Sequence, residues 1–130
     1  TKGEQMSAFT TNWFDAEGAG SLEPEAGQPV RVSGGILEWE ALSGELGLID
    51  LQEGLGELEY TIGYAWIDFE VPQEMPAWLG IGSDDGIKLW HNGELVHDKR
   101  VHRRSRIDDD IVPLKLAAGH NTLLVKIQNA

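Results

Sequence analysis

The chain has 130 residues, a formal net charge of −12 and no cysteine. This length fits one domain with its own core, and the absence of cysteine excludes disulfides, cysteine-based zinc sites and thiolate nucleophiles. No apolar run approaches the ~18 residues of a membrane span, and the negative charge argues against unselective binding to nucleic acid or anionic membrane. The chain opens at Thr1 without a Met or a signal-peptide pattern, which predicts a processed protein or an excised module.

The first half of the chain predicts a surface loop followed by short strands. Residues Asp15–Gln28 are rich in Gly, Pro and Glu and predict an exposed loop. We expect strands at Val30–Val32 and at Ile36–Trp39. From Gly63 to Val71, apolar and polar residues alternate with a period of two, which is the pattern of a half-buried strand. Pro72 ends this strand because proline cannot donate to a ladder.

The second half predicts further short strands, and no segment shows a sustained helical period. The apolar run Ala77–Ile81 predicts a buried central strand. Asn92-Gly93 predicts a tight hairpin, since a type I′ turn needs positive φ at both central positions. The remaining strands are expected at Ile87–His91, Glu94–His97, Ile111–Leu116 and Thr122–Ile127. Many short strands separated by turns predict one all-β domain over residues 1–130, an antiparallel β-sandwich.

Charge is unevenly distributed along the chain. Residues 1–80 carry two basic and fifteen acidic side chains, whereas residues 81–130 carry eight basic and seven acidic ones. Half of all the cationic residues lie in one short segment: Lys99, Arg100, Arg103, Arg104 and Arg106. Arginine pairs with carboxylate or sulfate in bidentate geometry, so this loop is a candidate site for an acidic polysaccharide. The alternative is internal pairing with Asp98, with the acidic run Asp108–Asp110 and with the acidic first half of the chain, where exposed pairs contribute only ~0–1 kcal/mol each.

Aromatic side chains are a second candidate feature, because sugars stack their C–H faces on flat rings. Tyr64 and Trp66 share a strand face with Asp68 and Glu70, opposite the apolar stripe Ala65, Ile67, Phe69 and Val71. Trp90 shares its face with Lys88. Packing is the alternative for each of them, since tryptophan is highly buried on average. We assign Trp13, Trp39 and Trp78 to the core or its rim.

Two segments carry a family resemblance. They are Leu79–His97, with its Gly82-Ser83-Asp84-Asp85-Gly86 turn, and Val112–Leu116 followed by Gly119–Ile127. They resemble galactose-binding-like jelly-roll carbohydrate-binding modules, which are ancillary domains of bacterial polysaccharide-degrading enzymes. They also resemble, more weakly, the lectin domain of the protective-antigen type. The resemblance covers roughly residues 60–127. Two departures are His120, where such modules often carry an aromatic, and the end at Ala130, where a closing strand is expected.

Asp84 and Asp85 have two interpretations, of which the resemblance implies the first. In the lectin domain an adjacent Asp pair holds calcium, and oxygen ligands suit Ca²⁺, but six to eight of them are needed. The alternative is that both residues cap the turn by bonding backbone N–H groups. The four histidines show no zinc spacing, and carboxylate pairs such as Glu38/Glu40 have the separation of any two residues on one strand face. Catalysis is therefore not expected.

Together these features predict a non-catalytic carbohydrate-binding module for an acidic, uronate or sulfated, polysaccharide. The candidate ligand-binding residues are Lys99, Arg100, Arg103, Arg104, Arg106, Trp90, Tyr64 and Trp66. The resemblance implies a jelly roll that is secreted or on the surface of a bacterium and is attached to the domains of a parent enzyme. The alternative is a structural or protein-interaction domain without affinity for glycans.

Overall fold

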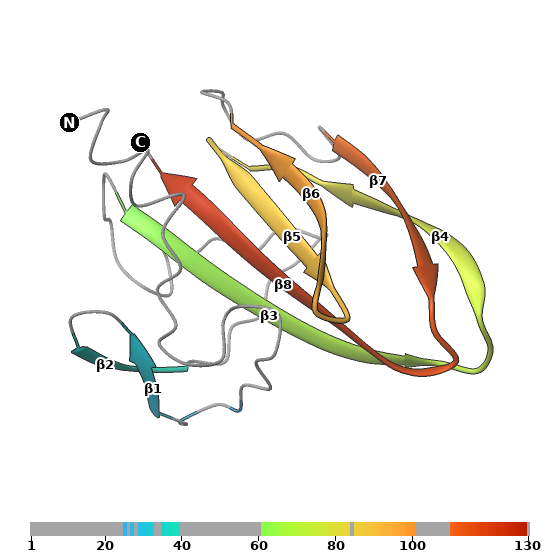
Figure 1. The fold of residues 1–130 in the computed structure, drawn as a ribbon, viewed down its shortest axis with the longest axis horizontal. Coiled ribbons are helices and arrows are strands. Elements are labelled where there is room, and N and C mark those ends of the chain that lie inside the picture. Colours follow the sequence, from blue (N-terminus) through green and yellow to red (C-terminus); the bar gives the residue numbers. More distant parts are fainter. Residues whose placement is uncertain are drawn as a thin grey trace.

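The structure is a computed structural model that describes residues 25, 27, 29–32, 35–39, 61–83, 85–100 and 110–129 (Figure 1). Every regular element in these ranges is a β-strand. The strands are β1 (Pro29–Val32), β2 (Gly35–Glu38), β3 (Thr61–Val71), β4 (Met75–Ile81), β5 (Ile87–His91), β6 (Glu94–Lys99), β7 (Asp110–Leu116) and β8 (Gly119–Asn129).

The described strands form antiparallel sheets. β3, β8, β5 and β6 make a four-stranded sheet in that order, β4 pairs with β7, and β1 pairs with β2. Figure 1 shows β4 and β7 set apart from the four-stranded sheet. Buried side chains of these two sheets meet in one core. The prediction of an all-β, antiparallel protein is thus confirmed, and the arrangement is consistent with a β-sandwich.

The core is built by the alternation that strands impose. In β7 every second residue is buried, so Val112, Leu114 and Leu116 face the core while the residues between them are exposed. The buried core comprises Ile87, Leu89, Val112, Leu114, Leu116, Leu123 and Val125. Burying one such aliphatic side chain contributes about 1.5–3 kcal/mol. Each sheet therefore keeps one face in the core and turns the other face away from it.

The β5–β6 hairpin has the predicted turn. His91 pairs with Glu94 across it, and Asn92 and Gly93 have φ values of 49° and 85°. Asparagine and glycine tolerate this left-handed region better than other residues. The two positive φ values match a type I′ turn, whose twist suits the flanking strands.

An irregularity in β6 separates its two ends. Trp90 pairs with Leu95, but the preceding residue, Leu89, pairs with His97, so Val96 is an extra residue in the ladder. Val96 packs against the core. Because of this β-bulge, two consecutive residues of β6, Val96 and His97, lie on the core side of the sheet. It leaves Asp98, the next residue, opposite Lys88 on the outer face.

A network centred on Asn121 ties the β5–β6 turn to the start of β8. The Asn121 side chain is fully buried. Its Oδ1 accepts from the Ala117 N–H at 3.0 Å and from Asn92 Nδ2 at 3.2 Å, and its Nδ2 donates to the carbonyls of Ala117 and Gly119. His91 Nε2 donates to the same Oδ1 at 3.0 Å. The β7–β8 turn therefore depends on one side chain for its polar contacts.

The structure corrects two expectations about β4. Ala77–Ile81 does not form a buried central strand, because β4 pairs only with β7 among the described residues and its exposure alternates along the strand. Trp78 is 75% exposed and is not a core residue. Ala77, Leu79 and Ile81 pack against the core. The run is apolar throughout because Trp78, which lies between them and faces outward, is apolar as well.

Other expectations are refined or lie outside the described residues. Ile67 belongs to the core-facing stripe of β3, yet it is 48% exposed because β3 is an edge strand of its sheet in the described part of the chain. Trp39 is half-buried, and Trp13 and the predicted loop Asp15–Gln28 fall largely outside the described ranges. The single-domain assignment stays a prediction.

Candidate functional site

The outer face of the four-stranded sheet brings together aromatic and cationic side chains from three strands. Antiparallel pairing places them in two adjacent rows across β3, β8 and β5. We call the following set the aromatic–lysine face: Tyr64, Trp66, Lys88, Trp90 and Lys126. Three of its members, Tyr64, Trp66 and Trp90, are residues that the sequence singled out, so the register supports grouping them.

The two tryptophans of this face flank one leucine. Trp66 of β3 and Trp90 of β5 are both opposite Leu124 of β8. Neighbouring strands are about 4.8 Å apart, so the two tryptophan backbones are separated by about 10 Å. Leu124 is buried, while both tryptophans are half-buried. On this face the β8 residues are covered, while the two tryptophan residues keep part of their surface exposed.

The second row carries two lysines side by side. Tyr64, Lys126 and Lys88 are opposite one another on β3, β8 and β5. Lys126 Nζ lies 5.6 Å from the centroid of the Tyr64 ring, a cation–π distance. Lys88 Nζ lies 4.0 Å from Asp98 Oδ2. This row therefore places Lys88 and Lys126 opposite each other on neighbouring strands, with Asp98 beside Lys88.

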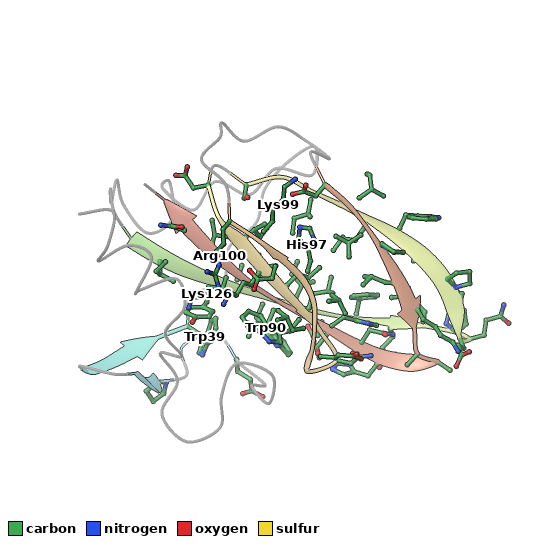
Figure 2. The ribbon with its side chains drawn as sticks, turned by 45° about the horizontal axis from the view of Figure 1, so that its top comes forward. Trp39, Trp90, His97, Lys99, Arg100 and Lys126 are labelled. Carbon is green, nitrogen blue, oxygen red and sulfur yellow. The ribbon has the colours of Figure 1, made fainter. Side chains whose placement is uncertain are left out.

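The electrostatics of Lys126 reflect this crowding. The residue is 2% exposed, and the pKa of Lys126 is lowered from 10.5 to about 8. Burial is the largest cause, the positive charge of Lys88 acts in the same direction, and Asp98 opposes both. Figure 2 labels Lys126 with Trp90 and Arg100 over the four-stranded sheet. Burial and a neighbouring ammonium group both disfavour the charged form of Lys126.

The cationic run begins at the end of β6. Lys99 Nζ donates to Asp110 Oδ1 at 2.6 Å, and Asp110 Oδ2 lies 3.6 Å from His97 Nε2. Lys99 thus forms the internal ion pair that was the alternative to ligand binding, although its side chain stays 41% exposed. Arg100 is exposed immediately after β6. The other three arginines, Arg103, Arg104 and Arg106, lie outside the described residues.

The Asp84-Asp85 turn is described only in part. Asp85 is buried, and its backbone carbonyl accepts a hydrogen bond from Ser83 Oγ at 2.8 Å. Asp84, Asp108 and Asp109 fall outside the described ranges. Within those ranges, no group of three or more His, Asp or Glu side chains is arranged to hold a metal ion. The calcium site therefore stays a prediction.

Sequence reasoning missed Lys126 as a member of the site. The signal was present in the sequence, because the polar residues Lys126 and Gln128 alternate with the apolar residues Val125 and Ile127. Placing Lys126 beside Lys88 required the strand order β3-β8-β5. That order depends on long-range pairing rather than on local pattern.

Comparison of the chain with known proteins found no match. No family model matches the chain, and neither curated proteins nor solved structures include a match. A search of the described residues for helices found none with the length and hydropathy that crossing a membrane requires.

Proposed function

We propose that the chain is a non-catalytic carbohydrate-binding module that binds an acidic polysaccharide on the aromatic–lysine face. The observation that carries this proposal is the register of β3, β8 and β5. It sets Trp66 and Trp90 in one row and Lys126 and Lys88 in the next. Stacking groups and cations are therefore adjacent on one sheet face.

The aromatic row suits a sugar chain. Indole rings offer flat apolar surfaces to the C–H faces of sugars, with their polar edges in water. The two tryptophans are about 10 Å apart at the backbone, a separation comparable with the length of a disaccharide. A chain lying across the strands would reach both rings.

The lysine row suits a uronate or sulfate group. An anion beside Lys88 would offset the repulsion between Lys88 and Lys126, because an opposite charge favours the ionised form of a lysine. A group that costs stability in the free protein and gains from a ligand is a functional candidate. Lys99 ends β6 and pairs with Asp110 on the core side of the sheet, so the contribution of the cationic run to this face would come from Arg100 and the arginines that follow it in the sequence. A jelly-roll topology, secretion and attachment to a parent enzyme are proposed from the resemblance alone.

The proposal is tested by titration with acidic glycans. We expect polygalacturonate, alginate, xanthan or a sulfated glycan to bind and to change tryptophan fluorescence, because two tryptophans line the face. Lys88→Gln should weaken binding about tenfold, the scale of one charge-assisted contact. Lys115→Gln is the matched control, since it removes the same charge from an exposed side chain of the other sheet. Equal affinity of the two variants would remove the lysine row from the site.

The contribution of the cationic loop is measured separately. Replacing Arg103, Arg104 and Arg106 with Ala should weaken binding and reduce its dependence on salt. Unchanged affinity in this triple variant would confine the site to the sheet face. The absence of binding across all four acidic glycans would favour the alternative, a structural or protein-interaction domain.

The affinity should also depend on pH in an unusual range. Uronate carboxylates stay ionised above pH 5, and an ordinary lysine stays charged up to about pH 10. The pKa of Lys126 is about 8, so its charge is lost between pH 7 and 9. We expect affinity for polygalacturonate to fall about five- to tenfold over this range, with proton uptake on binding near pH 8. Calorimetry in buffers of different ionisation enthalpy measures this uptake, and a flat profile would contradict a role for Lys126.

A further inference from the structure

The outer face of the β4–β7 sheet carries a tryptophan that the aromatic–lysine face does not use. Trp78 is 75% exposed, whereas the other described tryptophans are half-buried. Because tryptophan is highly buried on average, an indole this exposed calls for an explanation. The side chains of this face alternate with the core-facing ones and belong to Pro76, Trp78, Ile111, Pro113 and Lys115.

The neighbours of Trp78 leave its ring open. Trp78 is opposite Pro113, and Gly80, the next residue on the same face of β4, is opposite Ile111. Gly80 has no side chain to cover the indole, and Ile111 is itself exposed. Together Trp78, Pro113 and Ile111 form an apolar platform on a short two-stranded sheet. We call these three residues the Trp78 platform.

The size and the edges of this platform fit a small flat ligand better than a protein. An aromatic side chain offers about 150–250 Å², and a stable protein interface needs about 800 Å² per partner. A partner strand would have to pair with an edge of the sheet, but Pro76 and Pro113 lack the N–H groups that such pairing uses. The platform is therefore suited to stacking rather than to strand addition.

Among the residues that the structure describes, one oppositely charged pair lies beside the platform. Lys115 Nζ lies 3.0 Å from Glu74 Oε1, and both side chains are largely exposed. Lys115 lies on the same face of β7 as Pro113. The pair offers an ammonium donor group and a carboxylate acceptor group without adding net charge, which complements sugar hydroxyls better than a uronate. This contrasts with the positive row of the aromatic–lysine face.

We infer that the Trp78 platform is a second saccharide site, for neutral polysaccharides whose rings expose flat C–H faces. Trp78 stacks on a sugar ring, Pro113 and Ile111 extend the apolar surface, and the Lys115–Glu74 pair bonds hydroxyls. This site uses residues and a sheet that the proposed function does not use, and the two proposals have in common only that the ligand is a glycan. Because the core separates the two sheets, the two sites are on opposite sides of the molecule. One molecule could then link an acidic chain to a neutral one.

The test uses the full chain and insoluble cellulose, xylan and mannan. The wild type should be retained by at least one of these solids, and Trp78→Ala should bind it about tenfold more weakly or worse. Trp78→Phe keeps an aromatic face and should recover part of the binding. Because Trp78 is largely exposed, the substitutions should leave thermal unfolding close to that of the wild type. Lys88→Gln serves as the control at the other site and should bind the neutral solid normally.

The outcomes separate this inference from the proposed function. Recruitment of labelled polygalacturonate to the neutral solid, lost in either Trp78→Ala or Lys88→Gln, supports both sites. Retention on the solid without affinity for acidic glycans supports the Trp78 platform and removes the proposed acidic site. If no neutral solid retains the wild type, or if Trp78→Ala binds equally well, the inference is overturned. A dimer in light scattering that Trp78→Ala dissociates also overturns it, since a second copy then covers the platform.

Discussion

Asn121→Ala should lower the free energy of unfolding by about 3 kcal/mol, with a drop in melting temperature of roughly 10 °C. The substitution removes a fully buried amide that satisfies both polar groups of Ala117 and the carbonyl of Gly119. A methyl group cannot replace these bonds. Each hydrogen bond contributes about 1 kcal/mol net, and a buried group left unsatisfied costs about 1–3 kcal/mol.

Two further variants test whether the loss of stability comes from the hydrogen bonds of the Asn121 side chain. Asn121→Asp keeps an acceptor for the Ala117 N–H, and when its carboxyl is protonated its O–H can donate one of the two bonds that Nδ2 donates. At such pH values the stability of this variant should fall between those of Asn121→Ala and the wild type. His120→Ala changes the exposed neighbouring residue and should stay within about 0.5 kcal/mol of the wild type. Chemical denaturation measures all three. A loss below 0.5 kcal/mol for Asn121→Ala would show that water or the backbone replaces the network.

Lys126→Met should change how stability depends on pH. The folded-state pKa of about 8 is below the usual 10.5, so between these values the unfolded chain binds more protons and the wild type becomes more stable as pH rises. Methionine does not titrate. The stability of the variant relative to the wild type should therefore be greatest below pH 8 and should decrease by up to about 3 kcal/mol as pH approaches 10.5.

The measurement is a set of urea unfolding curves from pH 7 to 10.5 on both proteins. Lys115→Met is the control, because Lys115 is exposed beside Glu74 and its substitution should give a difference that varies little with pH. A constant difference between Lys126→Met and the wild type over the whole range would show that Lys126 titrates like an exposed lysine. It would also remove the electrostatic argument for an anionic ligand.

Local sequence pattern predicts much of this fold. Period-two alternation predicts β3 and β5, and Asn92-Gly93 predicts the turn and the returning strand β6, because each of these signals depends on residues close together in the chain. The misassignment of β4 has a physical cause. An apolar run on both faces indicates burial only if both faces are covered, and the sequence does not say that Trp78 faces outward.

The candidate site was predictable only in pieces. Tyr64 and Trp66 share a face by parity alone, and Trp90 and Lys88 likewise. Joining the two pairs requires β8 between β3 and β5, which is a long-range pairing. The position of Lys99 illustrates the same limit, since its partner Asp110 is supplied by a different strand. The choice between a ligand cation and an internal ion pair is decided by tertiary structure.

The single extra residue at Val96 has a consequence for how this surface can change. With the bulge, β6 sends Asp98 to Lys88 and Lys99 toward Asp110, so two acid–base pairs are sorted onto opposite sides of one sheet. Without the bulge, regular pairing of β5 and β6 would place His97 opposite Lys88 and would move Asp98 to the core side of the sheet. Inserting or deleting one residue in this hairpin would therefore exchange the charged side chains between the two faces of the sheet, although the set of charged residues would stay the same.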